Sequence, residues 1–160
     1  MPFPFSIKYT TPLEGKVDPE DYRLILKQIS NFIIPKPAKD IVIDGNELKF
    51  KPGSSPSRWN LMNPIDRGTF LLNEIEGQTA LSYEFFMYKH FIYTSIIAAV
   101  VGIVSPIIWF GIVAFFWFCG FIWLIALTRH KDMFDELVKE INSATWQREL
   151  GEEPISTQST

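Results

Sequence analysis

The most informative pattern in the chain is an uncharged, largely apolar run from Phe91 to Thr128. None of the 15 Lys and Arg residues or the 18 Asp and Glu residues falls within it. As one straight helix this run would be roughly 57 Å long, about twice the thickness of a bilayer's hydrocarbon core. Pro106 follows Ser105 near its middle and disfavours helical geometry there. The sequence therefore predicts a transmembrane helical hairpin over residues 90–128, with its turn near 105–106. A re-entrant hairpin is the alternative, because the first helix is short.

Basic residues flank the predicted hairpin on one side only. Lys89 precedes the first helix, and Arg129 and Lys131 follow the second, while the connecting turn has no basic residue. Cytoplasmic flanks of membrane helices are enriched in Lys and Arg. We therefore expect an integral protein of an inner or plasma membrane, or an equivalent one, with both termini cytoplasmic and the lipid bilayer as its first partner.

Small side chains recur at spacings of three and four along the first predicted span, which allows close helix packing. They are Ser95, Ala98, Ala99, Gly102 and Ser105. The second span is rich in Phe and Trp on every face, so no periodicity selects one packing side. The small residues could close the hairpin on its own second helix or pack against another subunit, and the pattern does not choose between them.

Residues 1–89 alternate in a way that predicts a small cytosolic α+β domain with one helix and about five short strands. The helix is expected to begin at Asp18 as its cap and Pro19 in its first turn, and to end at Pro35. Its buried side is expected to include Tyr22, Ile25, Ile29, Phe32 and Ile33.

Two hairpins account for four of the expected strands. Residues 40–51 alternate around Asp44-Gly45-Asn46, and residues 69–87 alternate around Glu76-Gly77. Glycine tolerates the positive φ that tight hairpin turns require. Residues 5–9 are expected to form an edge strand or the first strand of a crossover.

Residues 129–149 predict an amphipathic cytosolic helix that continues from the second membrane span, and residues 150–160 predict a disordered tail. The apolar face of the helix holds Phe134, Leu137, Val138 and Ile141. This face could lie on the membrane surface, pack back on the N-terminal domain, or bind another chain. Interfacial helices usually have a basic polar face, whereas this one is acidic, so we expect these four residues to dock a protein partner.

Chemistry-bearing motifs are absent from the sequence. It has two histidines, His90 and His130, a single cysteine, Cys119, and none of the common phosphate-binding, hydrolase or zinc-protease strings. We therefore expect no catalytic residue, no metal and no cofactor. The formal net charge of -3 argues against a nucleic-acid partner. The polar loop from Lys51 to Arg58, rich in Pro, Gly and Ser, is the one candidate for binding a small ligand.

Three functions fit these features. The favoured hypothesis is a small accessory subunit of a membrane protein complex, anchored by the hairpin and docking other subunits through its cytosolic domain. The second is a membrane-tethered sensor or ligand-binding module that uses the loop from Lys51 to Arg58. The third is a homo-oligomeric pore-forming effector.

Overall fold

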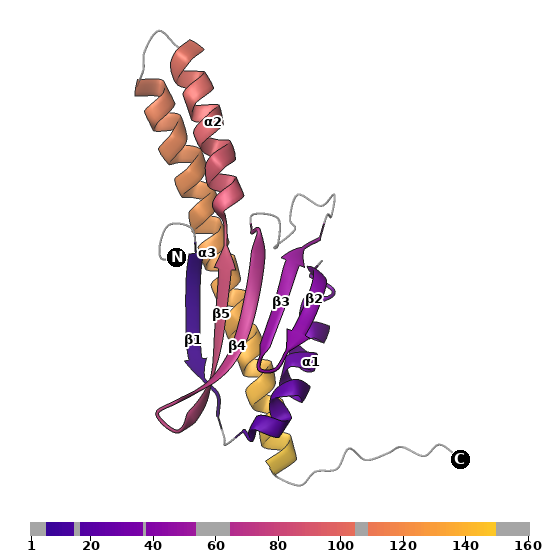
Figure 1. The fold of residues 1–160 in the computed structure, drawn as a ribbon. Coiled ribbons are helices and arrows are strands. Elements are labelled where there is room, and N and C mark those ends of the chain that lie inside the picture. Colours follow the sequence, from indigo (N-terminus) through magenta and orange to yellow (C-terminus); the bar gives the residue numbers. More distant parts are fainter. Residues whose placement is uncertain (1–5, 15–16, 37, 54–64, 105–108, 150–160) are drawn as a thin grey trace, which may run out of the picture.

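The computed structural model describes residues 6–14, 17–36, 38–53, 65–104 and 109–149, and within that last helix the side chains of 114 and 144–149 are not described. The fold is α+β, with one antiparallel five-stranded sheet and three helices in the described part of the chain (Figure 1). In chain order the elements are β1 (Ser6–Pro12), a 3-10 turn (Pro19–Asp21), α1 (Tyr22–Ile33), β2 (Ala38–Asp44), β3 (Glu47–Pro52), β4 (Arg67–Ile75), β5 (Gln78–Phe86), α2 (Tyr88–Val104) and α3 (Trp109–Glu149).

The strand order in the sheet is β1-β5-β4-β3-β2, and every neighbouring pair is antiparallel. Both predicted hairpins are present. Gly45, at φ 57°, turns β2 into β3, and Glu76 and Gly77, at φ 53° and 79°, turn β4 into β5. In the β4–β5 turn, positive φ at both central residues suits the right-handed twist of the flanking strands. The first strand lies at the edge of the sheet, where Tyr9 pairs with Tyr83.

One face of the sheet carries the hydrophobic core. Alternate strand residues point into it, and α1 and α3 cover them (Figure 1). The fully buried strand residues are Leu48, Phe50, Phe70, Leu72, Leu81, Tyr83 and Phe85. Ile43 pairs with the buried Leu48 but remains 37% exposed, because β2 is an edge strand of the sheet.

The first helix has the predicted buried side but not the predicted start. Ile25, Ile29 and Ile33 are buried, as is Leu26, which the expected set omitted. Asp18 precedes only the 3-10 turn, and its side chain makes no capping hydrogen bond. The α-helix itself begins at Tyr22, since the 3-10 turn takes up the first residues after the proline.

The last helix is continuous across the boundary predicted at residues 128–129. Its 41 residues run from Trp109 to Glu149 without a break. Its C-terminal part crosses the covered face of the sheet (Figure 1), and the four residues expected to dock a partner are buried in the core. Phe134, for example, is 1% exposed and stacks with Tyr9 and Tyr83. This apolar face therefore completes the core of its own chain, because the sheet and α1 alone leave part of the covered face open.

Candidate functional site

The helical hairpin projects beyond the sheet (Figure 1), and many of its apolar side chains are exposed. Ile103, Phe116 and Trp117 are 84%, 70% and 69% exposed. A segment of α3, Trp109–Ser143, is long and apolar enough to cross a membrane, and only 18% of its most apolar window is buried. The core helix of a soluble protein would be mostly buried instead. The 17-residue α2 is apolar but shorter. The structure thus supports one helix of membrane-spanning length, and the crossing by two helices remains a proposal.

The small residues of α2 divide between two sides. Gly102 and Ala98 face α3 at Gly111, where an added Cβ would lie 2.8 Å from Gly102 Cα and 2.9 Å from Ala98 O. Ser95 and Ala99 are exposed, and Ser105 lies outside the described residues. The small residues therefore bring α2 and α3 of the same hairpin close together at Gly102 and Gly111. Thr94, which the small-residue pattern did not include, is buried on the same side as Ala98.

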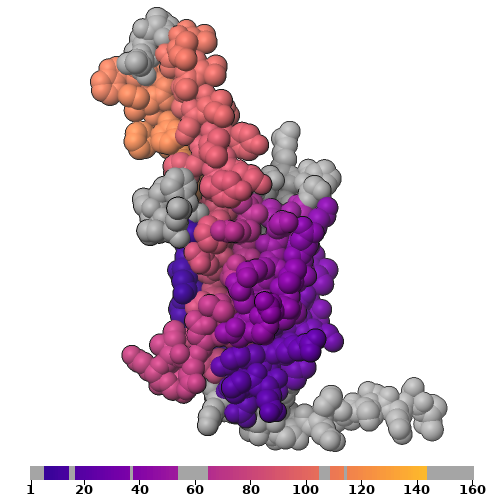
Figure 2. Space-filling model, in the orientation of Figure 1, coloured from indigo at the N-terminus to yellow at the C-terminus, as the bar shows by residue number. Residues whose placement is uncertain are grey.

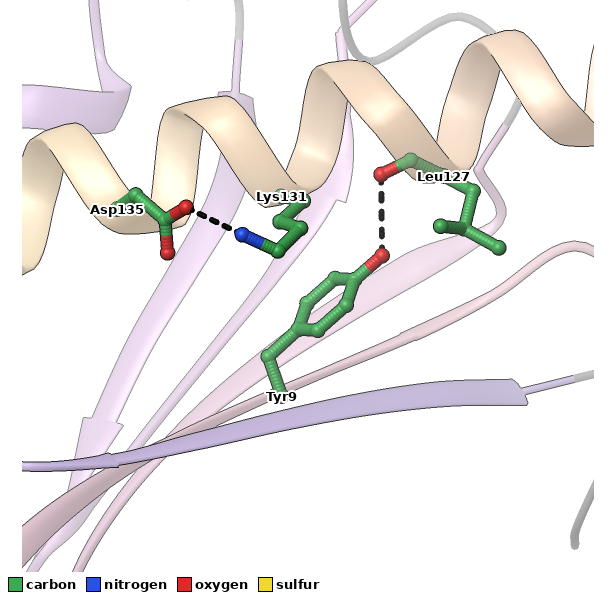
Figure 3. Close-up of polar contacts among 4 residues, drawn as sticks. All are labelled: Tyr9, Leu127, Lys131 and Asp135. Carbon is green, nitrogen blue, oxygen red and sulfur yellow. Dashed lines mark hydrogen bonds and ion pairs between the residues drawn. The ribbon is translucent and has the colours of Figure 1, made fainter.

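Polar contacts join the middle of α3 to the sheet. The Tyr83 hydroxyl lies 2.9 Å from Nδ1 of His130, and both residues are fully buried. From the edge strand, the Tyr9 hydroxyl donates to the carbonyl of Leu127 at 3.0 Å (Figure 3). One turn further along α3, Lys131 pairs with Asp135 at 2.7 Å, which raises the pKa of the lysine (Figure 3). The hairpin is thus held to the sheet through Tyr9 of β1 and Tyr83 of β5.

The other face of the sheet is open. In the view of Figure 1, α3 runs behind the strands, and Figure 2 shows β3 to β5 at the surface in the same orientation. A hollow of about 650 Å³ lies on this face, which we call the sheet hollow. Its lining includes Lys8, Lys49, Lys51, Arg67, Thr69 and Glu84. The volume is in the range of ligand-binding pockets.

The strand register explains why these side chains meet. Lys8 pairs with Glu84, Glu84 with Thr69, and Thr69 with Lys49, so one row of residues crosses four strands on the open face. Next to it, Arg67 pairs with Phe86 and holds its guanidinium carbon 4.1 Å from the centre of that ring. With Asp40 and Val42 of β2, which also line it, the hollow is assembled from all five strands.

The predicted ligand loop is only partly described. Lys51 lies at the end of β3, lines the sheet hollow and forms an ion pair with Asp40 at 3.1 Å. Arg58 lies outside the described residues. Sequence reasoning singled out the loop but missed Lys8, Lys49 and Arg67. Each belongs to a different strand, and only the alternation of the strands could have indicated that they share a face.

Metal-binding groups are not assembled in the part of the chain that the structure describes. No group of three or more His, Cys, Asp or Glu side chains there could hold an ion. His130 is engaged with Tyr83, and Cys119 is buried on α3.

No protein-family model, curated protein or solved structure matches this chain.

Proposed function

We propose that this protein is a small accessory subunit of a membrane protein complex. The α2–α3 hairpin lies in the bilayer, and the sheet domain is held at the cytoplasmic surface, where it docks other subunits. The proposal rests chiefly on the continuity of α3, which passes from an exposed apolar segment into the core of the sheet domain. A continuous helix fixes the domain at the membrane surface with no flexible linker.

The exposure of the hairpin supports its placement in lipid. Large side chains exposed on both helices are apolar or aromatic, and neither helix has a charged residue between Phe91 and Thr128. In water such a surface would drive association, whereas in a bilayer it is the ordinary exterior. Lys89, Arg129 and Lys131 flank this region on the side of the sheet domain, and this basic flank favours a cytoplasmic location for the domain.

The edge strand β2 offers a surface for a protein partner. It pairs with β3 on one side, and no strand in the described part of the chain pairs with its other side. Val42 and Ile43, which point to opposite faces, are 56% and 37% exposed. Unpaired edges with apolar side chains are templates for an added strand. This edge replaces the C-terminal helix as the expected docking surface.

Site-directed labelling tests the membrane topology. In a Cys119→Ala background, a membrane-impermeant maleimide should label Ser105→Cys from outside intact cells. It should label Glu20→Cys, an exposed position before α1, only after the membrane is opened. A Ser105→Cys variant that stays unlabelled until permeabilisation would indicate the re-entrant hairpin. A Glu20→Cys variant labelled in intact cells would contradict a cytoplasmic domain.

Purification of the tagged protein in mild detergent tests the subunit role. We expect other chains in fixed ratio with the wild type and their loss from the double variant Val42→Lys, Ile43→Lys. Gln78→Lys, an exposed change on β5, serves as the matched control and should retain them. A particle that contains this chain alone would contradict the proposal.

The sheet hollow favours a second candidate function, a membrane-tethered ligand-binding module. It brings charged side chains of five strands around a volume large enough for a small molecule. A ligand of this hollow should raise the melting temperature of the full chain in detergent. The rise should vanish in the Arg67→Ala variant, which removes one wall of the hollow.

A further inference from the structure

Basic side chains of the sheet gather at the end next to the hairpin. The Lys and Arg residues of the described strands are Lys8, Lys39, Lys49, Lys51 and Arg67. Arg67 is paired with Phe86, the last residue of β5 before α2, and Lys8 is paired with Glu84 two residues earlier. Lys39 pairs with Lys51 at the same end of β2 and β3. The positive charges of the sheet therefore occupy its half nearest the hairpin.

The far end of the sheet has the opposite charge. Asp44 and Glu47 flank the β2–β3 turn, and Glu74 and Glu76 lie at the β4–β5 turn. The described strands and hairpin turns have no Lys or Arg at that end. A charge gradient thus runs along the strands, with its positive end toward the hairpin. An anionic membrane surface attracts the positive end and repels the negative one.

The positive end of the sheet is close enough to reach lipid headgroups if the hairpin lies in the bilayer, so the inference rests on the proposed function. Only Met87 separates Phe86 from α2, and the uncharged run begins at Phe91. At ordinary rises for strand and helix, Phe86 and Phe91 are roughly 11 Å apart along the chain. The headgroup region is roughly 5–8 Å thick on each side. Arg67, opposite Phe86, therefore lies at or just below the headgroups.

The sheet hollow reaches this positive end. Lys51 and Arg67 line it there, both are exposed, and Lys8 and Lys49 line it one row further down. The ring of Phe86 supports the guanidinium of Arg67, which reduces the freedom lost when the guanidinium binds. A guanidinium donates two parallel N–H bonds to a phosphate. The ion pair of Lys51 with Asp40 is exposed and that of Lys49 with Glu47 is half-exposed, so both are weak enough to exchange for a stronger anion.

We propose that the hairpin end of the sheet hollow binds the headgroup phosphate of an anionic phospholipid from the cytoplasmic leaflet. Arg67 donates to the phosphate oxygens, and Lys51, Lys49 and Lys8 supply surrounding positive charge. The basic end of the sheet then serves as a lipid-binding site beside the anchor. The acidic end stays away from the membrane and leaves the distal part of the domain to protein partners.

Native mass spectrometry of the full chain from nanodiscs tests this site. Discs contain equal amounts of phosphatidylcholine and phosphatidylglycerol, and the lipids that stay bound are counted. The wild type should retain phosphatidylglycerol over phosphatidylcholine by about fivefold or more, the preference expected from one basic side chain at an anionic surface. The double variant Lys51→Glu, Arg67→Glu should retain the two lipids equally. Lys27→Glu, an exposed charge reversal on α1, should keep the wild-type preference.

The remaining outcomes distinguish a failure of the lipid site from a failure of the membrane anchor. Entry into discs of phosphatidylcholine alone tests the hairpin, so failure to enter them would overturn the membrane anchor and the lipid site together. Entry without preference for phosphatidylglycerol, or an unchanged preference in the double variant, would overturn only the lipid site. Soluble glycerol 3-phosphate supplies the final arm. If it displaces phosphatidylglycerol and raises the melting temperature in neutral discs, the hollow binds free phosphate esters instead of lipid.

Discussion

Tyr83 Oη lies 2.9 Å from His130 Nδ1, and neither side chain is exposed to solvent. This contact joins the middle of β5 to α3 two residues after the uncharged run ends at Thr128. Aromatic rings surround it, with the Tyr83 ring 4.5 Å from that of Phe70 and the His130 ring 4.4 Å from that of Phe85. The last helix, α3, and the sheet are therefore linked by a buried hydrogen bond within an aromatic cluster.

Removal of this hydroxyl should weaken the domain. Tyr83→Phe keeps the ring but deprives His130 Nδ1 of the hydroxyl, and a buried polar group without its partner costs about 1–3 kcal/mol. We expect a lower melting temperature for the full chain in mild detergent. Tyr88→Phe is the matched control, because Tyr88 is 43% exposed, and it should melt like the wild type. Equal melting of Tyr83→Phe and the wild type would show that the hydrogen bond adds nothing to stability.

The same tyrosine should make the protein sensitive to high pH. Burial raises the pKa of Tyr83 well above the ordinary value of 10.0, and the nearby Tyr9 adds to the shift. Above pH 10 the unfolded chain loses this proton while the folded chain keeps it, so the free energy of unfolding falls as the pH rises. Below pH 10 both states are protonated and Tyr83 adds no pH dependence. Melting measured from pH 8 to 11 should fall more steeply for the wild type than for Tyr83→Phe, and parallel curves would contradict the shift.

Close packing of the hairpin should depend on Gly111. Gly111→Ala would place a methyl group against backbone atoms of Gly102 and Ala98, which cannot rotate away. We expect a loss of about 1–3 kcal/mol, the usual cost of overpacking, seen as a lower melting temperature in detergent. Gly120→Ala on the same helix meets nothing within 4 Å and should leave melting unchanged. Identical melting of the two variants would mean that α2 and α3 are not closely packed.

The ring of Phe50 should leave room only for glycine at position 68. A Cβ at Gly68 would overlap that ring, which is buried at 1% exposure and stacks with Phe70. Gly68→Ala should therefore destabilise the domain by about 1–3 kcal/mol. The double variant Gly68→Ala, Phe50→Leu should recover part of the loss relative to the sum of the single changes. Additive effects in this cycle would show that the ring does not constrain residue 68.

The C-terminal half of α3 should be part of the folded core. Leu137→Ala removes a side chain with 0% exposure, and such truncations cost about 2–5 kcal/mol. Hydrogen exchange of β5 should accelerate in this variant, because the strand packs beneath the helix. Glu140→Ala, an exposed change on the same helix, should leave the exchange of β5 as it is. If β5 exchanges as slowly in Leu137→Ala as in the wild type, the C-terminal half of α3 is not part of the core.

Local sequence signals predicted the hairpins and the first helix of the domain. Turns such as Asp44-Gly45-Asn46 determine their own backbone through the conformational freedom of glycine, so neighbouring residues suffice to locate them. The start of α1 was less predictable, since both a 3-10 turn and an α-helix tolerate Pro19 in their first turn. The small residues at Ala98 and Gly102 signalled close packing, but only the fold shows Gly111 as the residue they meet.

The sequence by itself determined the strands, the helices and the uncharged run, because periodicity and turn chemistry depend on residues near one another in the chain. Only the tertiary structure decided what covers the apolar face of residues 134–141 and which charges share the sheet hollow. Both depend on contacts between distant segments, such as Tyr9 with Phe134 and Lys8 with Glu84. An amphipathic face shows that something must cover it, but the same pattern fits a membrane, a partner and the chain's own sheet equally well.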